Sequence, residues 1–446
     1  MKAGNFKMKI LVLGSGGREH AIVYALVKSK IFAGKQDDIK KYLHSAPGNS
    51  GIARDAQCHQ ANINAPDEIL ELCKKLEIDL VVIGPEEPLI VGVSDILREN
   101  GIKVFGPGAK GAKLEGSKSF SKQFMVRNGI PTSEFDVCTT MPQCKEALMK
   151  RQGKNPFIIK ADGLAAGKGV FIPDSYDEAY DVCSNLLERH FLGDAGNTLV
   201  IENYVEGKEL TILAMTDGEN AILLEPSQDH KRVFDGNKGP NTGGMGVYAP
   251  VAWADKDLLS KITSQILNPT LDGLKKEGIS YCGVLYMGLM IKPNGELCLL
   301  EYNSRFGDPE TQAVLPIFNG DFGEAVLACC NGTLGEYAEH YSLGSLSGDT
   351  PKYSVCVVLT SGGYPKFFEP GKKIEGIDEA EAIPEVEIYH AGTKEISPGD
   401  IRTTGGRVLG VTAFSNNPVD ARSKVYEAIG KISFENMHYR KDIGKA

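Results

Sequence analysis

Mostly apolar runs of strand length recur along the chain, and several of them end in turns rich in glycine. Residues 8–13, 79–84 and 103–105 are such runs, and each is followed by a loop of Gly, Pro or Glu. The first is followed by an apolar pattern of helical period that extends through Leu26. Strands that alternate with helices in this way are typical of a doubly wound parallel sheet. We therefore predict an N-terminal domain of this class over residues 1–113.

The middle of the chain contains two predicted hairpins and a long polar stretch. Residues 158–161 and 170–172 are predicted strands joined by a loop of glycines, alanines and lysines. Residues 282–291 and 295–303 predict a second strand pair across a Pro-Asn-Gly turn. The stretch 227–246 is dense in charge and glycine, and we expect it to be a long functional loop without regular structure.

These patterns together predict a multidomain α/β protein. A helix is expected to begin after Ser117, whose side chain can cap it, and to end at Arg127. We place a central region at 114–340, with residues 131–204 as a small lid subdomain. Residues 341–446 are expected to form a last small α/β domain that packs against the first domain and contributes to the substrate cleft.

Composition and charge narrow the class of protein. A chain of 446 residues is too long for one core, and 42% hydrophobic with 24% charged residues is ordinary for a globular protein. The net charge of −9 argues against nucleic acid or an anionic membrane as the main partner. No apolar run has the length of a membrane span. Residues 1–7 lack the apolar core of a signal peptide and are interpreted as a short extension, for which Met8 is an alternative start.

The cysteines lead to an expectation about the cellular compartment. Ten cysteines include no C-x-x-C pair and no Cys/His cluster at zinc spacing. Reduced, buried thiols in a cytoplasmic enzyme are the simplest interpretation. Small-molecule substrates are expected as the partners of a monomer or weak homo-oligomer.

The loop of the first hairpin has the composition of a phosphate-binding loop. Gly163, Gly167 and Gly169 let backbone N–H groups approach a ligand, while Lys160 and Lys168 supply positive charge. The loop is not a P-loop, because its glycines are one residue closer, Gly169 replaces Ser or Thr, and a strand follows. A solvated turn is the alternative. The number of small residues favours binding.

A second glycine turn follows the first predicted strand. Gly14, Gly16, Gly17 and Arg18 lie at the C-terminal end of that strand, where open α/β sheets bind ligands. The dinucleotide fingerprint fails because Glu19 stands at its third glycine. A phosphate on a smaller molecule therefore fits better than NAD, and glycines that serve only a tight turn are an equal alternative.

A polar cluster ends the second hairpin. Glu301 and Asn303 are two apart on a strand, so their side chains share one face, and a carboxylate with an amide oxygen suits Mg²⁺ held jointly with nucleotide phosphates. Arg305 can reach the same face with a planar fork of donors. Glu202 and Glu209 lie at a junction further upstream, where each alone is equally well explained as a strand-edge carboxylate.

Taken in order, these motifs resemble the ATP-grasp superfamily and, within it, the phosphoribosylamine–glycine ligase family. The resemblance covers essentially the whole chain from Met8, and we expect the chain to be monofunctional. It rests on residues 14–20, 47–49, 84–86, 114–118, 160–169, 227–232, 239–246, 304–312, 390–393 and 405–409. It implies ATP-dependent ligation of glycine to 5-phosphoribosylamine through glycyl phosphate in de novo purine biosynthesis, with ATP and Mg²⁺ or Mn²⁺.

The resemblance also implies roles for single residues. Arg305, Lys160 and Asp308 would act in catalysis, and Glu301 and Asn303 would bind the metal. The nucleotide would contact Lys118, Lys160, Gly163, Gly167, Lys168, Gly169, Glu202 at the adenine amino end and Glu209 at the ribose. Phosphoribosylamine would contact Gly14, Gly16, Gly17 and Arg18 through its phosphate, and Pro47, Gly48, Asn49 and Glu86 near its sugar. Glycine would be framed by Asp229, Lys231, Asn241, Thr242, Gly243, Gly244, Arg305 and Asp308.

One departure and three alternatives remain. Many ATP-grasp enzymes carry another metal-binding carboxylate on the strand before E-x-N, but residues 285–291 have none, so water and phosphate oxygens would complete the metal site. The alternatives are another ATP-grasp carboxylate–amine ligase or carboxylase, an NAD-dependent oxidoreductase and a nucleotide sensor. Glu19 argues against the oxidoreductase. The joint presence of Lys160, Glu301, Asn303 and Arg305 argues against the sensor.

Overall fold

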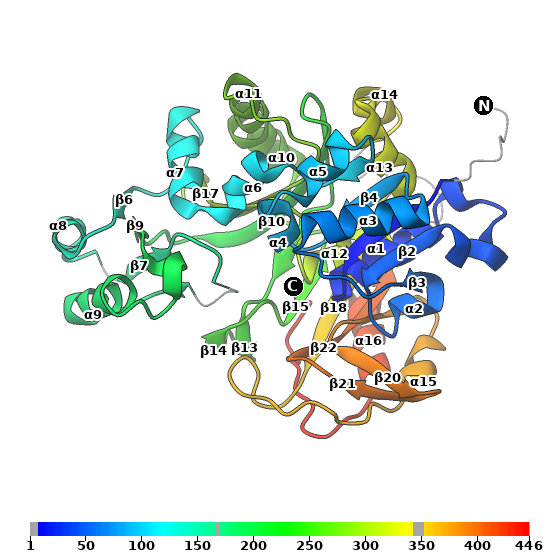
Figure 1. Ribbon diagram of the computed structural model, residues 1–446. Helices are drawn as coiled ribbons and strands as arrows, with labels where there is room; N and C mark the ends of the chain where they lie inside the picture. Colours follow the sequence, from blue (N-terminus) through cyan, green and yellow to red (C-terminus); the bar gives the residue numbers. More distant parts are fainter. Residues whose placement is uncertain (1–7, 155, 166–168, 342–351, 446) are drawn as a thin grey trace.

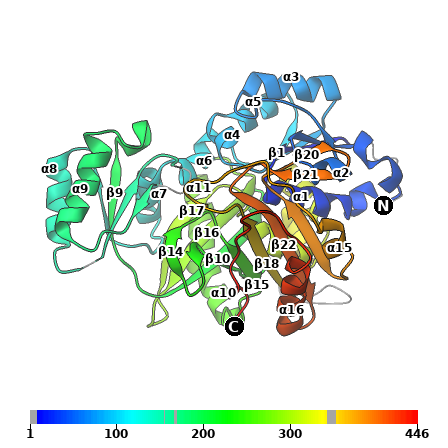
Figure 2. The same ribbon diagram turned by 90° about the horizontal axis from the view of Figure 1, so that it is seen from below.

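The computed structural model describes residues 8–154, 156–165, 169–341 and 352–445. Figure 1 shows the lid subdomain projecting to one side of a larger body, and Figure 2 shows the same arrangement from below. Gly167 and Lys168 lie outside the described residues, so their predicted contacts with the nucleotide stay predictions.

A five-stranded parallel sheet forms the N-terminal region, in the order β3-β2-β1-β4-β5. Its strands are β1 (Ile10–Gly14), β2 (Leu43–Pro47), β3 (Gln57–Cys58), β4 (Leu80–Ile83) and β5 (Lys103–Phe105). Its helices are α1 (Gly17–Val27), α2 (Ile52–Asp55), α3 (Pro66–Leu76), α4 (Glu87–Ile90) and α5 (Val93–Glu99), with short 3-10 turns at Lys30–Phe32 and Gln36–Lys41. The order reverses between β1 and β4, so a ligand crevice is expected at their C-terminal ends. The predicted doubly wound class is confirmed.

The central region is built on an antiparallel sheet in the order β11-β10-β16-β17. These strands are β10 (Lys208–Thr216), β11 (Ala221–Leu223), β16 (Gly283–Ile291) and β17 (Leu297–Asn303). One face packs against α6 (Ala109–Gly116), α7 (Lys118–Arg127), α10 (Lys256–Ile262), a π-helical turn (Thr263–Leu267) and α11 (Asn268–Lys276). Ser117 caps α7 by accepting the N–H of Phe120, as the sequence predicts.

The lid subdomain has its own small sheet and core. Its antiparallel strands β6 (Phe135–Cys138), β9 (Leu199–Asn203), β7 (Phe157–Ala161) and β8 (Val170–Phe171) pair in that order. Helices α8 (Met141–Lys150) and α9 (Tyr176–Leu187), with a 3-10 turn at Gly193–Gly196, pack on this sheet. The first predicted hairpin is confirmed, because β7 and β8 pair with Lys160 opposite Val170.

The C-terminal sheet takes two strands from an earlier part of the chain. Its order is β12-β15-β18-β22-β19, and its strands are β12 (Gln228–Asp229), β15 (Gly246–Ala249), β18 (Tyr353–Thr360), β22 (Arg407–Ser415) and β19 (Val386–His390). The strands β13 (Arg232–Phe234) with β14 (Lys238–Asn241) and β20 (Thr393–Ser397) with β21 (Asp400–Thr403) form two small hairpins, and the helices are α15 (Ile377–Glu381) and α16 (Pro418–Ile429).

This topology corrects one prediction. The stretch 227–246 is not a loop without regular structure, because it contains β12, the β13–β14 hairpin and the start of β15. β13 pairs with β14, β12 pairs with β15, and β15, which begins at Gly246, pairs with β18. This backbone pairing does not depend on an apolar side-chain pattern. The sheet also spans the predicted boundary at residue 341, which itself stays a prediction.

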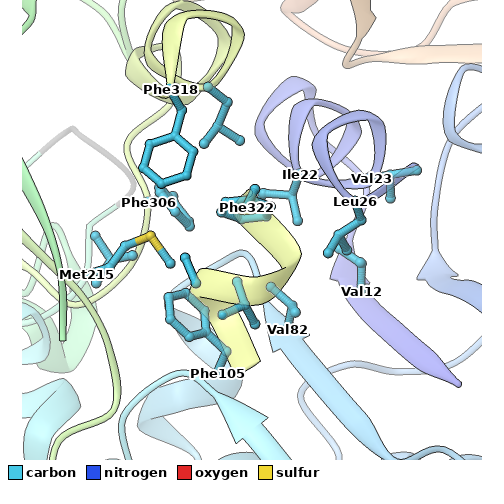
Figure 3. Close-up of a cluster of buried hydrophobic side chains, with 14 of the residues drawn as sticks. Val12, Ile22, Val23, Leu26, Val82, Phe105, Met215, Phe306, Phe318 and Phe322 are labelled. Atoms are coloured by element: carbon cyan, nitrogen blue, oxygen red, sulfur yellow. The ribbon is translucent and has the colours of Figure 1, made fainter. Parts of the chain in front are cut away.

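The largest core joins the first sheet to the central region. Figure 3 shows Val12 and Val82 of the first sheet facing Met215 of β10 across Phe306 and Phe322. Helices α12 (Glu310–Val314), α13 (Phe322–Asn331) and α14 (Leu334–Ala338), with the 3-10 turn Leu315–Ile317, fill the space between them. The first sheet and the floor of the central region are therefore held in one packed unit.

The C-terminal region packs on the N-terminal one, as predicted. Lys28 pairs with Glu387 at 2.6 Å, and Asn49 donates to the carbonyl of His390 at 2.7 Å. All ten cysteines lie among the described residues and none is in a disulfide. In the same part of the chain no single helix has the length and apolar character of a membrane span, although the pair Glu310–Ile317 and Phe322–Asn331, bent by 103°, passes that test jointly.

Candidate active site

A cavity of about 700 Å³ lies where the lid, the central sheet and the N-terminal region meet. It brings together residues that are far apart in the sequence. Those among its lining residues that the sequence predicted are Arg18, Glu86, Lys118, Lys160, Gly169, Glu202, Glu209, Asp229, Lys231, Asn241, Thr242, Gly243, Glu301, Asn303, Arg305 and Asp308. Most of the predicted nucleotide and glycine residues therefore share one cavity with both predicted metal ligands.

A second cavity of about 390 Å³ adjoins the first. It is lined by the predicted residues Gly16, Gly48, Asn49 and Asp308, and by Ser15, Ala391, Gly392, Thr393, Thr404, Gly405 and Arg407. Asp308 and Arg407 line both cavities and so connect them. The predicted residues Gly14, Gly17, Pro47, Gly163 and Gly244 line neither one.

Two lysines and a glutamate form a buried ionic cluster at the junction with the lid. The carboxylate of Glu202 on β9 lies 2.6 Å from Nζ of Lys160 on β7 and 2.7 Å from Nζ of Lys122 on α7. Ser133 also donates to this carboxylate. Burial would raise the pKa of Glu202, but the two ammonium groups outweigh it and hold the pKa at about 2. Each oxygen of the Glu202 carboxylate already contacts a lysine. These contacts do not test the predicted contact between Glu202 and adenine, which stays a prediction.

Lys118 is placed by the strand that carries Lys160. Asp162 follows β7, and its carboxylate accepts hydrogen bonds from Ser117 and from the backbone N–H of Ser119 at the start of α7. Lys118 Nζ donates to the carbonyl of Gly163 at 3.3 Å. Lys118 and Lys160 therefore reach the same cavity from a helix and a strand that are tied together at their ends.

Glu301 and Asn303 fit a divalent cation by their chemistry and position. They lie on β17 opposite Gly288 and Tyr286 of β16, and both line the main cavity. The described residues contain no cluster of three or more His, Cys, Asp or Glu side chains suited to a metal. A carboxylate and an amide oxygen are two hard ligands, so phosphate oxygens and water would supply the rest of a Mg²⁺ shell.

Arg305 is held by four neighbouring oxygens at the point where the domains meet, one of which is the carbonyl of Phe306 at 3.2 Å. Its guanidinium contacts Glu115 at 2.8 Å, Glu86 at 3.3 Å and Oδ1 of Asn303 at 3.3 Å. Burial raises the pKa of Glu115 to about 7, with Arg305 opposing and Glu86 adding to the shift. Arg305 thus links the proposed metal ligand to carboxylates of the N-terminal region, on the face that the sequence predicts.

The predicted glycine frame combines β12 with the segment after β17. Asp229 pairs with Lys231 at 2.6 Å, and the Asp229 side chain is 3% exposed while that of Lys231 remains 39% exposed. Asp308 pairs with Arg407 at 3.0 Å and accepts from Gln312 at 2.7 Å. An ammonium-carboxylate ligand could therefore find groups of both signs in this part of the cavity.

The first glycine turn differs in detail from its prediction. Glu19 folds back over the turn, where its carboxylate accepts the N–H of Gly16 at 2.6 Å and pairs with Arg18 at 2.6 Å. A Cβ at Gly84 would lie 2.1 Å from this carboxylate, so Glu19 fills the space between β1 and β4. The N–H of Gly16 and much of the charge of Arg18 are thus already used inside the protein, which also explains why the turn does not suit a dinucleotide.

Several cavity residues had no predicted role. Lys122 lies four residues after Lys118 and therefore on the same helical face, which is a signal that the sequence does contain. Glu115 and Glu310 face the cavity from helices, where a carboxylate is ordinarily a solvated group. Arg407 enters from β22, about a hundred residues beyond Asp308, and only the fold brings these two together.

Comparison with known proteins agrees with this geometry. Models of the phosphoribosylglycinamide synthetase N domain, ATP-grasp (A) domain and C domain match residues 8–115, 116–311 and 354–446. The chain belongs to the phosphoribosylglycinamide synthetase family. It is 42% identical to the phosphoribosylamine–glycine ligase of Synechocystis sp. over 439 residues, which is 98% of this chain and 99% of that protein. A relative with the same name from Caldanaerobacter subterraneus is 41% identical over 436 residues, covering 98% and 99%.

Comparison with solved structures supports the same assignment to the phosphoribosylglycinamide synthetase family. The crystal structure of phosphoribosylamine–glycine ligase from Thermotoga maritima superimposes with a TM-score of 0.79 at 36% identity, covering 98% of this chain and 100% of that one. The biotin carboxylase domain of Hydrogenobacter thermophilus 2-oxoglutarate carboxylase gives 0.69 at 18% identity over 96% and 91%, a likeness of fold alone. The predicted family, ATP-grasp fold and enzyme class, a ligase forming C–N bonds, are confirmed.

Proposed function

We propose that this chain joins glycine to 5-phosphoribosylamine at the expense of ATP, giving glycinamide ribonucleotide, ADP and phosphate in de novo purine biosynthesis. One observation carries the proposal. A single cavity joins the Lys118–Lys160 pair and the Glu301–Asn303 pair to the groups of both signs around Asp229, and it shares the lining residues Asp308 and Arg407 with a second cavity. The two adjoining cavities thus offer neighbouring sites for ATP, glycine and phosphoribosylamine, which differ in charge.

The first step phosphorylates the carboxylate of glycine. An oxygen of that carboxylate attacks the γ-phosphorus of ATP, ADP leaves, and glycyl phosphate forms. Negative charge is concentrated at the reacting phosphoryl group, and Lys118, Lys160 and Arg305 are positive groups held in the same cavity before the reaction begins. A divalent metal on Glu301 and Asn303 would supply further charge neutralisation, and we infer that Mg²⁺ or Mn²⁺ serves.

The second step transfers the glycyl group to the amine. The amine of phosphoribosylamine attacks the acyl carbon, and inorganic phosphate leaves as the amine loses a proton. We place the 5-phosphate of this substrate in the second cavity, where Arg407 supplies charge and Ser15, Thr393 and Thr404 supply hydroxyls. We assign this role to Arg407 rather than to Arg18, because Arg407 lines the second cavity and Arg18 does not.

The lid protects the intermediate. Acyl phosphates are hydrolysed by water, so the cavity has to close while glycyl phosphate is present. The lid strands β7 and β9 contribute Lys160 and Glu202 to the cavity, so closure over the nucleotide and assembly of the charged site involve the same elements. No protein nucleophile is needed, which agrees with cysteines that have no place in the cavity lining.

The test is ADP release measured with ATP, Mg²⁺, glycine and phosphoribosylamine generated in place. We expect turnover to require both glycine and phosphoribosylamine, to be lost in Lys160→Ala and to persist in Lys113→Ala, which changes an exposed lysine of α6. ADP release with another acid but not with glycine would discard the substrate and keep the fold. Absence of ATP turnover in the wild type would contradict the proposal.

We infer further that the enzyme acts in the cytoplasm on these small molecules, as a monomer or weak homo-oligomer. The net charge of −9 supports partners other than nucleic acid. Sedimentation of the purified chain over a range of concentrations tests the oligomeric state, and a mass that stays that of a tight oligomer at high dilution would contradict it.

A further inference from the structure

The ionic cluster at the lid junction contains one more cation than anion. Lys122 and Lys160 both contact the carboxylate of Glu202, at 2.7 and 2.6 Å, and the three side chains are between 2% and 10% exposed. Lys122 Nζ also donates to Thr132 at 2.8 Å and to Ser133 at 2.9 Å, and Ser133 donates to Glu202. Lys122 thus has three oxygen partners and a fixed position.

The two lysines face the cavity differently. The ammonium of Lys122 is enclosed by Glu202 and the two hydroxyl groups, whereas Lys160 has the single ionic partner Glu202 among the described residues. Both residues line the cavity, beside Lys118 and Glu301, which add one charge of each sign. The cluster of Lys122, Lys160 and Glu202 therefore presents a net charge of about +1 to the nucleotide site, and Lys160 is the more exposed of its two ammonium-bearing side chains, at 10% against 2%.

Removing Lys122 would change this balance without touching Lys160. Glu202 would then neutralise Lys160 alone, and the cluster would have no net charge. Two ammonium groups around one carboxylate also agree with a Glu202 pKa of about 2, because burial by itself would raise that pKa.

We propose that Lys122 is a positioning residue of the nucleotide site: by sharing Glu202, it leaves the positive charge of Lys160 available to the phosphates of ATP. This inference rests on the proposed function, since it needs a nucleotide in the main cavity. Lys122 itself then touches no reacting atom. It acts through Glu202, and its removal lowers affinity for the nucleotide more than it lowers the rate of the chemical step.

Four charge states of the cluster separate this role from simple packing. The net charge of the cluster is about +1 in the wild type, 0 in Lys122→Met, +2 in Glu202→Gln and +1 in the double variant. We expect Lys122→Met to raise the dissociation constant of MgATP by roughly tenfold or more. The double variant is expected to regain most of that loss, because the neutral amide no longer cancels Lys160. If Lys122 only filled space, the double variant would be at least as impaired as Lys122→Met.

The experiment is calorimetric titration of each full-length variant with MgATP at two salt concentrations, together with kcat and KM for ATP. Lys113→Met, which removes an exposed lysine outside the cavity, is the matched control and should bind as the wild type does. Lys122→Arg, which keeps the charge, should retain more affinity than Lys122→Met. We also expect the affinity of Lys122→Met to depend less on salt than that of the wild type, since fewer charges are screened.

Thermal unfolding of each variant identifies loss of folding. If Lys122→Met does not fold, the double variant decides, because its cluster carries the same net charge of about +1 as that of the wild type and should bind MgATP with nearly wild-type affinity. A folded double variant that binds MgATP tenfold or more weakly than the wild type would overturn the inference, as would wild-type affinity in a folded Lys122→Met. Failure of the wild type to bind MgATP would instead overturn the proposed function, so the two failures are distinguishable.

Discussion

Arg407 offers the sharpest test of how the C-terminal region completes the site. One of its terminal nitrogens donates to the carbonyls of Gly243 at 2.7 Å and Asp308 at 2.8 Å, and the other pairs with the Asp308 carboxylate at 3.0 Å. Burial would raise the pKa of Asp308, but Arg407, Arg18, Arg305 and the hydrogen bond from Gln312 together outweigh it, and the pKa is lowered. Arg407→Ala would leave a largely buried carboxylate and two carbonyls without these donors.

The expected magnitude follows from these contacts. A hydrogen bond from a guanidinium to a phosphate contributes about 1.5–3 kcal/mol, and we take the upper end because the Arg407 side chain is only 23% exposed. A loss of about 3 kcal/mol corresponds to a factor of roughly a hundred. Arg407→Ala is therefore expected to lower kcat/KM for phosphoribosylamine about a hundredfold. Arg407→Lys should lie between it and the wild type, because it keeps the charge and loses the fork.

The assay is steady-state ADP release with phosphoribosylamine varied and ATP and glycine saturating. The matched control is Arg402→Ala, because Arg402 belongs to the same C-terminal region, pairs with Asp400 at 3.1 Å near the surface and lines neither cavity. Arg402→Ala should behave as the wild type. If kcat/KM for phosphoribosylamine is no lower in Arg407→Ala than in this control, Arg407 does not bind the substrate phosphate and the second cavity has another role.

Three further predictions concern the glycine frame, pH and the metal. A Cβ at Gly244 (φ +115°) would lie 2.4 Å from Cδ of Pro309, whereas a Cβ at Gly236 (φ +69°) would meet only a flexible lysine at 4.0 Å. Gly244→Ala should therefore raise KM for glycine, while Gly236→Ala should lower only the stability of the fold. Equal KM values for the two variants would refute this. Glu115 has a folded pKa of about 7 against 4.5 for a free carboxyl, so its stabilising proton is fully bound below pH 4.5 and lost as pH rises through about 7. The Tm of Glu115→Gln should therefore fall less than that of the wild type as pH rises from 4.5 to about 7. Over this interval the titration of Glu115 changes the free energy of unfolding by at most about 3 kcal/mol. Parallel curves of Tm against pH for the two proteins would exclude this titration. Chelation of divalent ions should abolish turnover, and Glu301→Ala should raise the Mg²⁺ concentration needed for half-maximal rate; an unchanged requirement would remove Glu301 from the metal site.

Local patterns predicted most elements of the fold, because each depended on few neighbours. The apolar run before Gly14 became β1, Ser117 capped α7, and the spacing of Glu301 and Asn303 placed both on the cavity side of β17. Period and capping are properties of short segments, so one sequence is enough to identify them. The stretch 227–246 was the exception, because its strands form by backbone pairing: β13 with β14, and β12 with β15, which itself pairs with β18 more than a hundred residues further along the chain.

The site was predictable where chemistry was concentrated in one segment and not where it depended on distant partners. The glycine loop and the E-x-N-x-R strand end carry several candidate residues each. Glu19 was interpreted only as a missing glycine, whereas the structure shows it as the ion-pair partner of Arg18, and the phosphate contact predicted for Arg18 stays a prediction. Lys122 and Arg407 gain their meaning from Glu202 and Asp308, and only tertiary contacts reveal those pairs.

The central claim is that the glycine carboxylate is phosphorylated before the amine attacks. The most direct measurement supplies glycine labelled with oxygen-18 in its carboxylate, together with ATP, Mg²⁺ and phosphoribosylamine, and determines the isotope content of the inorganic phosphate. The account predicts one labelled oxygen in the phosphate for each glycinamide ribonucleotide formed, with the other retained in the amide. Phosphate without the label, at full product yield, would contradict it.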